Sequence, residues 1–127
     1  MLEAQANYAT KLIEIEKQKL NNVKSYYEGL VSYEQQLNKL QEKEFELSQA
    51  HGNYEKSSDY NTRIKNRQDE LAIMRKQAKA MQDQLNQAVK LGNVKVDSIE
   101  YREMNTSVLA VKESIKDMEI EIENLIQ

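Results

Sequence analysis

Residues 85–104 read LNQAVKLGNVKVDSIEYREM, and this stretch decides the fold because it closes one helix and opens another. Gly92 can adopt the left-handed conformation that ends a helix. Asp97 and Ser98 are alternative N-caps, since either side chain can accept hydrogen bonds from the free amides of a following helix. If Asp97 is the cap, Glu100 completes a capping box. The stretch therefore predicts a sharp turn between two helices.

Apolar residues on both sides of this turn recur at steps that alternate between three and four. This spacing keeps them on one helix face and is typical of helices that wind into a left-handed coiled coil. Arg67 occupies one of these positions, where a polar residue commonly sets register or oligomeric state. The predicted packing residues before the turn are Ile64, Leu71, Met74, Ala78, Met81 and Leu85, and those after it are Met104, Val108, Val111, Ile115, Met118 and Ile122.

A second break is predicted at His51, Gly52 and Asn53, where Gly52 can close the first helix and one of Ser57, Ser58 and Asp59 can cap the next. The predicted fold is all-α, with three long antiparallel coiled-coil helices and a hairpin formed by the last two. Its parts are a first helix within residues 1–50, a turn at 51–57, a second helix over 58–91, a turn at 92–97 and a third helix over 98–127.

The first helix has a less regular apolar pattern and is the longest of the three. At about 1.5 Å per residue it exceeds both partners, so we expect its first dozen residues to extend beyond the hairpin or to join another chain. Two successive three-residue steps around Leu30 predict local overwinding. Its predicted packing positions are Leu20, Val23, Tyr27, Leu30, Tyr33, Leu37, Leu40, Glu44 and Leu47.

The composition limits the class of protein. The chain has no Pro and only three Gly, which permits very long helices, and no Cys, which excludes disulfides and thiolate metal sites. No run approaches the roughly 18 consecutive apolar residues of a membrane span. The formal net charge of −3 argues against a general attraction to nucleic acid or anionic lipid.

Residue types that carry chemistry are present, but their spacing does not favour a reactive site. The single histidine, His51, lies at a break with no nucleophile or second ligand nearby in the sequence. Glutamates two residues apart, as at Glu42, Glu44 and Glu46, point away from one another on a helix. We therefore expect no catalytic residue, no cofactor, no metal ion and no enzymatic activity.

The stretch around Gly92 resembles a helical hairpin in the long tail tape measure proteins of siphophages and related prophages of Gram-positive bacteria. In that family a small residue and Gly end one helix, an apolar pair follows, and Ser opens a helix that carries an aromatic residue and a Glu-Met pair. Asp97 departs from the usual second Gly, and Tyr101 departs from the common Trp. The matching residues are Gly92, Val94, Val96, Ser98, Tyr101, Glu103 and Met104, and the similarity extends over about 58–126.

The resemblance implies a structural role in setting tail length and in tail assembly, as a segment of a much longer protein. Expected partners are other helices of the same protein, further copies of it, or tail tube and tail assembly proteins. The expected location is the virion tail, or the host cytoplasm during assembly. Two alternatives remain open: a coiled-coil adaptor or secretion-apparatus stalk, and the coiled-coil arm of a nucleic-acid-associated protein that binds through the basic stretch from Arg63 to Lys79.

Overall fold

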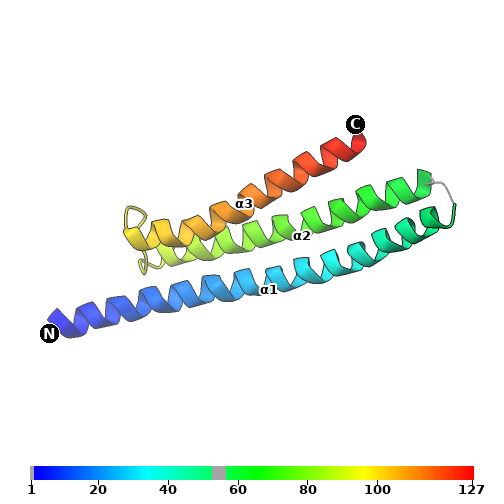
Figure 1. Cartoon of the computed structure of the whole chain (residues 1–127). Helices are drawn as coiled ribbons and strands as arrows, with labels where there is room; N and C mark the ends of the chain where they lie inside the picture. Colours follow the sequence, from blue (N-terminus) through cyan, green and yellow to red (C-terminus); the bar gives the residue numbers. More distant parts are fainter. Residues whose placement is uncertain (1, 53–56) are drawn as a thin grey trace.

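The computed structural model describes residues 2–52 and 57–127, which form three helices and no strand (Figure 1). Helix α1 spans Leu2–Ala50, α2 spans Ser57–Lys90 and α3 spans Ile99–Ile126. Helix α2 lies between the other two and packs along both, whereas α1 and α3 touch little. The all-α class and the hairpin of the last two helices are confirmed. Left-handed winding into a coiled coil stays a prediction of the heptad pattern.

The core lies mainly between α2 and α3. Met81, Leu85, Ala88 and Val108 have no exposed side-chain surface. Full burial of the larger side chains, Met81, Leu85 and Val108, stabilises the fold by about 1.5–3 kcal/mol each. Of the twelve packing residues predicted for α2 and α3, eleven are buried and Ile64 is partly buried. The buried ones are Leu71, Met74, Ala78, Met81, Leu85, Met104, Val108, Val111, Ile115, Met118 and Ile122.

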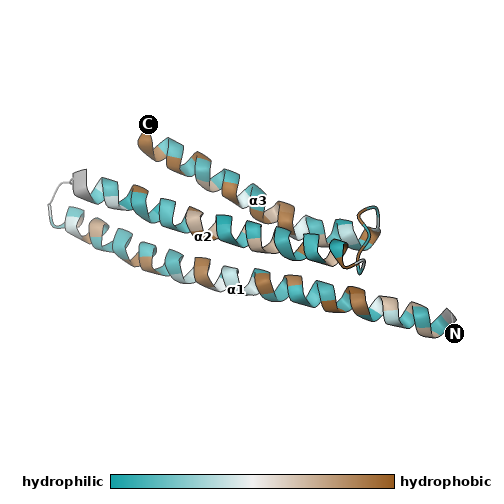
Figure 2. Ribbon diagram, turned by 180° about the vertical axis from the view of Figure 1, so that it is seen from behind, coloured by the Kyte–Doolittle hydropathy of each residue, from teal (hydrophilic) through white to brown (hydrophobic). Residues whose placement is uncertain are grey.

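The predicted packing face of α1 is correct only from Leu20 to Tyr27. Brown, apolar positions recur along α1 in Figure 2, but beyond Tyr27 most of the large ones are exposed. Instead, α1 packs against α2 through a different face, and the residues on this face are buried or partly buried. They are Val31, Glu34, Asn38, Gln41 and Phe45. The prediction failed because α2 offers polar partners, so the polar face of α1 packs inward. The exposed residues are Leu30, Tyr33, Leu37, Leu40, Glu44 and Leu47.

Helix α1 also extends beyond the turn that joins α2 to α3, as Figure 1 shows. Residues 3–11 are exposed, and burial begins at Leu12 and Ile13. Near this end, Lys17 forms an ion pair of 2.8 Å with Glu103 of α3. Burial within the chain therefore starts about one heptad and a half from the described start of α1.

Candidate interaction surfaces

The turn between α2 and α3 is built by backbone hydrogen bonds. The Gly92 amide donates to the Val89 carbonyl at 2.9 Å, and the Asn93 amide donates to the Ala88 carbonyl at 3.0 Å. This is the Schellman arrangement that closes a helix when the residue after the cap has a positive φ. Gly92 has φ of +77°, and Val94, two residues later, is buried.

Ser98 is the N-cap of α3. Its hydroxyl accepts from the Tyr101 amide at 3.1 Å and donates to the Lys95 carbonyl at 2.6 Å. The alternative with Asp97 as cap is therefore wrong, and so is its capping box. With Ser98 as the cap, Glu100 occupies the second helical position, where its negative charge interacts favourably with the positive end of the helix dipole.

The first break has a similar closing device. Gly52 has φ of +87°, and its amide donates to the Gln49 carbonyl at 2.9 Å. Helix α2 begins at Ser57, with Asp59 in its first turn. Residues 53–56, which include Asn53, lie outside the described residues, as do the side chains of Ser57 and Ser58.

Arg67 joins all three helices. Its guanidinium donates to Glu42 of α1 at 2.6 Å, to Glu121 of α3 at 2.8 Å, and to Glu70 of α2 at 3.4 Å. Glu70 is almost completely buried and also accepts from the Asn38 amide nitrogen at 2.7 Å. The position that the sequence marks as a polar interruption is thus the centre of a network.

The Arg67 guanidinium keeps its positive charge at neutral pH. Burial alone would lower the pKa of Arg67, but the three neighbouring carboxylates raise it above its ordinary value. A cation whose pKa is raised by folding contributes stability at every pH below its unfolded pKa. While the three carboxylates are ionised, this contribution is therefore present at neutral pH, and deprotonation of Arg67 removes it only in strong alkali.

Glu16 forms a second polar contact that sequence reasoning missed. It is 1% exposed, and its carboxylate accepts from Gln84 Nε2 and from Asn93 Nδ2, both at 3.0 Å. The signal was present, because Glu16 follows Ile13 by three residues and precedes Leu20 by four, the spacing of a packing position. Because Asn93 lies in the turn between α2 and α3, its hydrogen bond to Glu16 connects α1 to this turn.

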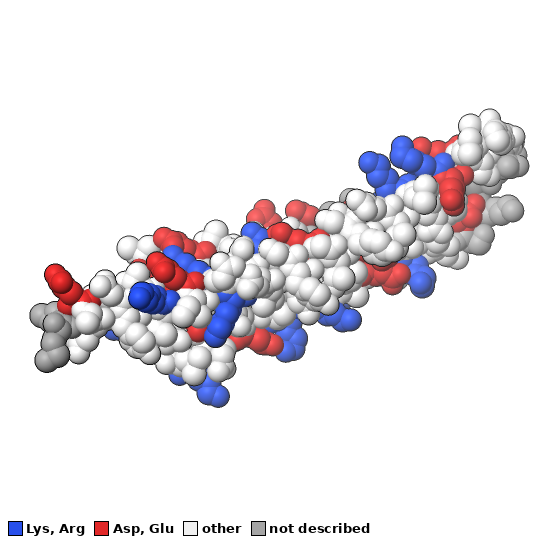
Figure 3. All heavy atoms as spheres, turned by 90° about the horizontal axis from the view of Figure 1, so that it is seen from below, with Lys and Arg blue, Asp and Glu red and all other residues white. Residues whose placement is uncertain are grey.

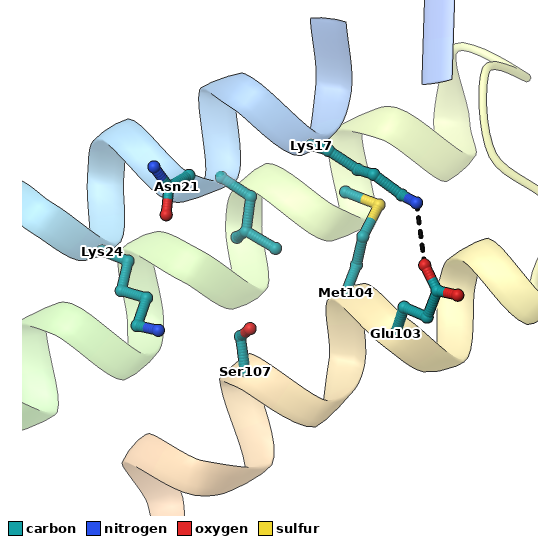
Figure 4. Close-up of a pocket in the computed structure, with 7 residues that line it drawn as sticks. Lys17, Asn21, Lys24, Glu103, Met104 and Ser107 are labelled. Atoms are coloured by element: carbon teal, nitrogen blue, oxygen red, sulfur yellow. Dashed lines mark hydrogen bonds and ion pairs between the residues drawn. The ribbon is translucent and has the colours of Figure 1, made fainter. Parts of the chain in front are cut away.

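The surface between α1 and α3 carries open grooves. The one in Figure 4 has a volume of about 190 Å³ and is lined by Leu20 and Met104, with the ion pair of Lys17 and Glu103 at its edge. A larger groove of about 470 Å³ lies over Met74 and Gln77 of α2. Within residues 2–52 and 57–127, no group of three or more His, Asp or Glu could hold a metal ion.

Positive and negative side chains alternate along the face shown in Figure 3. Positive and negative side chains are also mixed along the basic stretch of α2. Lys65 forms an ion pair with Asp69, Lys79 with Asp83, and Arg75 with Glu119. The hydrogen bond to Asp83 raises the pKa of Lys79. Paired cations of this kind attract phosphate less than an unpaired row would, so this surface does not favour the nucleic-acid alternative.

Beyond Tyr27, the large exposed apolar residues of α1 lie on one face of the helix. We define the α1 stripe as Leu30, Tyr33, Leu37, Leu40 and Leu47, with Glu44 at the remaining position of the same heptad pattern. Each stripe position up to Glu44 precedes an α2-facing position by one residue, a rotation of about 100°. Glu28, Gln35 and Lys39, which line the grooves toward α3, lie one residue beyond α2-facing positions. The α1 stripe therefore faces away from α3.

The comparisons with known proteins add no assignment. In the described part of the chain, no helix is both long enough and apolar enough to cross a membrane. No protein family, curated protein or solved structure gave a significant match to the chain.

Proposed function

We propose that this chain is a structural module that acts through helix–helix contacts, as a coiled-coil segment of a phage tail tape measure protein. Its role would be in tail length determination and assembly. The observation that carries the proposal is the turn between α2 and α3, where the resemblance to that family is concentrated.

The residues that carry the resemblance also build the turn. Gly92 supplies the positive φ, Val94 and Met104 are buried, and Ser98 caps α3. Tyr101, at the aromatic position, packs against the core. A resemblance that rests on residues with structural roles supports shared architecture better than a match of solvent-exposed heptad positions would.

As a folded unit, the chain would span about the length of α1. At about 1.5 Å per residue, the 49 residues of α1 extend over roughly 74 Å, whereas 127 residues in one continuous helix would extend over about 190 Å. In the tail, the proposed partners are other helices of the parent protein, further copies of it, and tail tube or tail assembly proteins.

Deletion of these 127 residues in frame from the parent gene tests the proposal. We expect tails shorter by about 74 Å in electron micrographs, because the module contributes its folded length. Duplication of the segment is the matched control and should lengthen the tail by the same amount. A loss of about 190 Å would favour an extended segment, and tails of normal length with normal infectivity would exclude the ruler function.

A second candidate is a coiled-coil adaptor or secretion-apparatus stalk. The α1 stripe favours it, because an apolar face exposed over several helical turns is suited to binding another helix. Sequence reasoning expected such a partner surface at the start of α1, where Tyr8 and Ile15 are exposed, and this stays a prediction; the α1 stripe lies in the second half of the same helix. In a cell lysate, photo-crosslinkers at Gln36, beside the α1 stripe, should then capture one defined partner.

A further inference from the structure

The α1 stripe is a heptad face, not a scatter of apolar residues. From Leu30 to Leu47 its positions step by three and four residues in strict alternation and cover about 26 Å of helix. Leu37 and Leu40 at its centre are 47% and 60% exposed. An alternating pattern of this kind fits another helix that lies almost parallel or antiparallel to α1.

We propose that the α1 stripe binds the α1 stripe of a second copy of this chain, with the two helices antiparallel. In this arrangement the helices are related by a two-fold axis that passes between Asn38 and Lys39. The same surface is then used on both copies, as in most soluble homodimers. The inference does not rest on the proposed function.

The antiparallel register makes the stripe complementary to itself. With the axis at this point, Leu37 faces Leu40 of the second copy, and Leu30 faces Leu47 of the second copy. The one charged position, Glu44, faces Tyr33, whose hydroxyl can donate a charge-assisted hydrogen bond to the carboxylate. Every leucine thus meets a leucine, and the carboxylate meets a donor.

A parallel pair in register would be less favourable. It would place Glu44 directly against Glu44 of the second copy, so that two like charges lose water without a partner. In the antiparallel pair, the exposed flanking contact is Gln36 with Lys43, which does not join like charges. Charge therefore selects the antiparallel orientation.

The position of the stripe leaves the rest of the fold intact on pairing. Because it faces away from α3, a second copy can dock there without disturbing the apolar packing of α2 against α3.

Sedimentation equilibrium of the 127-residue chain tests for the second copy. We expect a concentration-dependent dimer whose dissociation constant rises at least about tenfold in the Leu40→Asp variant, a change of about 1.4 kcal/mol. Ile120→Asp on α3 is the matched control, because Ile120 is 59% exposed and Leu40 is 60% exposed. A monomer at all concentrations, or equal effects of both substitutions, would overturn the proposal.

Disulfide trapping tests the orientation, since the chain has no cysteine of its own. Leu30→Cys and Leu47→Cys, made in separate chains and mixed, should form a mixed disulfide under mild oxidation, because these positions face each other. Each variant alone should form little disulfide. Efficient cross-linking of each variant with itself would indicate parallel helices and would overturn the antiparallel pairing.

Discussion

The two helix interfaces of this chain differ in chemistry although both use α2. Toward α3, α2 presents apolar side chains that include Leu71, Met81 and Leu85. Toward α1 it presents Glu70 and Gln77, which are buried and hydrogen-bonded to α1. Among the described residues, no buried side-chain nitrogen or oxygen lacks a hydrogen-bond partner.

The comparison separates stability from specificity. Apolar burial contributes large free energies but has no direction, so a purely apolar interface tolerates a shift in register. A hydrogen bond contributes only about 0.5–1.5 kcal/mol net, but a buried polar group left without its partner costs more than that. The α2–α3 interface therefore holds the hairpin together, and the α1–α2 interface fixes where α1 lies on it.

The largest expected effect breaks the apolar interface. Leu71→Asp should lower the free energy of unfolding by about 4 kcal/mol, because a charge without a partner replaces an apolar side chain that is 6% exposed. Urea denaturation measures the change. Lys65→Asp, on an exposed side chain that forms an ion pair of 3.4 Å with Asp69, is the control and should cost less than about 1 kcal/mol. Equal losses would show that Leu71 does not belong to the packing face.

An intermediate effect is expected at the polar interface. Arg67→Met should cost about 1–3 kcal/mol, because Glu70 would stay buried without its guanidinium partner and would keep the Asn38 amide as a donor among the described residues. The double variant Arg67→Met with Glu70→Met should recover part of this loss, since position 70 then no longer buries a charge.

The control for this prediction is Arg75→Met, which removes one exposed ion pair of 3.6 Å and should change stability by less than about 0.5 kcal/mol. Chemical denaturation of all four proteins gives the comparison. If Arg67→Met and Arg75→Met had the same effect, the network of Arg67 would contribute no more than a surface pair.

The smallest effect is expected at Gly92, in the turn between α2 and α3. Gly92→Ala should destabilise by about 1 kcal/mol, because alanine disfavours a φ of +77°. Gly29→Ala, inside α1, should stabilise by about 0.5–1 kcal/mol through helix propensity. An added Cβ has no neighbour within 4 Å at either position, so only backbone conformation differs. Thermal melts that shift in the same direction would contradict this explanation.

The hairpin could be predicted because its signals are local. The glycine that ends α2, the serine that caps α3 and the heptad spacing on both helices each depend on residues within a few positions of one another. The choice between Asp97 and Ser98 was not decided by sequence, since both residue types cap helices well and the result depends on the backbone conformation of 94–98.

The orientation of α1 could not be predicted in the same way. Leu30, Leu37 and Leu40 form a better apolar pattern than the face that α1 turns inward, so hydrophobicity alone selects the wrong side. The inward side is decided by Asn38, Gln41 and Glu42, whose hydrogen-bond partners Asn66, Arg67 and Glu70 lie on another helix. Only the pairing of α1 with α2 reveals that these groups are satisfied.

The contacts of Glu16 have a consequence for the order in which the chain closes on itself. Glu16 and Asn93 are 77 positions apart, whereas Glu42 and Arg67 are 25 apart. From an open chain, the entropy of closing the longer loop costs about 1 kcal/mol more, at about 0.6 kcal/mol for each doubling of length. Once both turns exist, most of that loop is already closed, and Glu16 can reach Asn93 at little further entropic cost. The contact between Glu16 and Asn93 thus forms most readily after both turns and the nearer contact between Glu42 and Arg67.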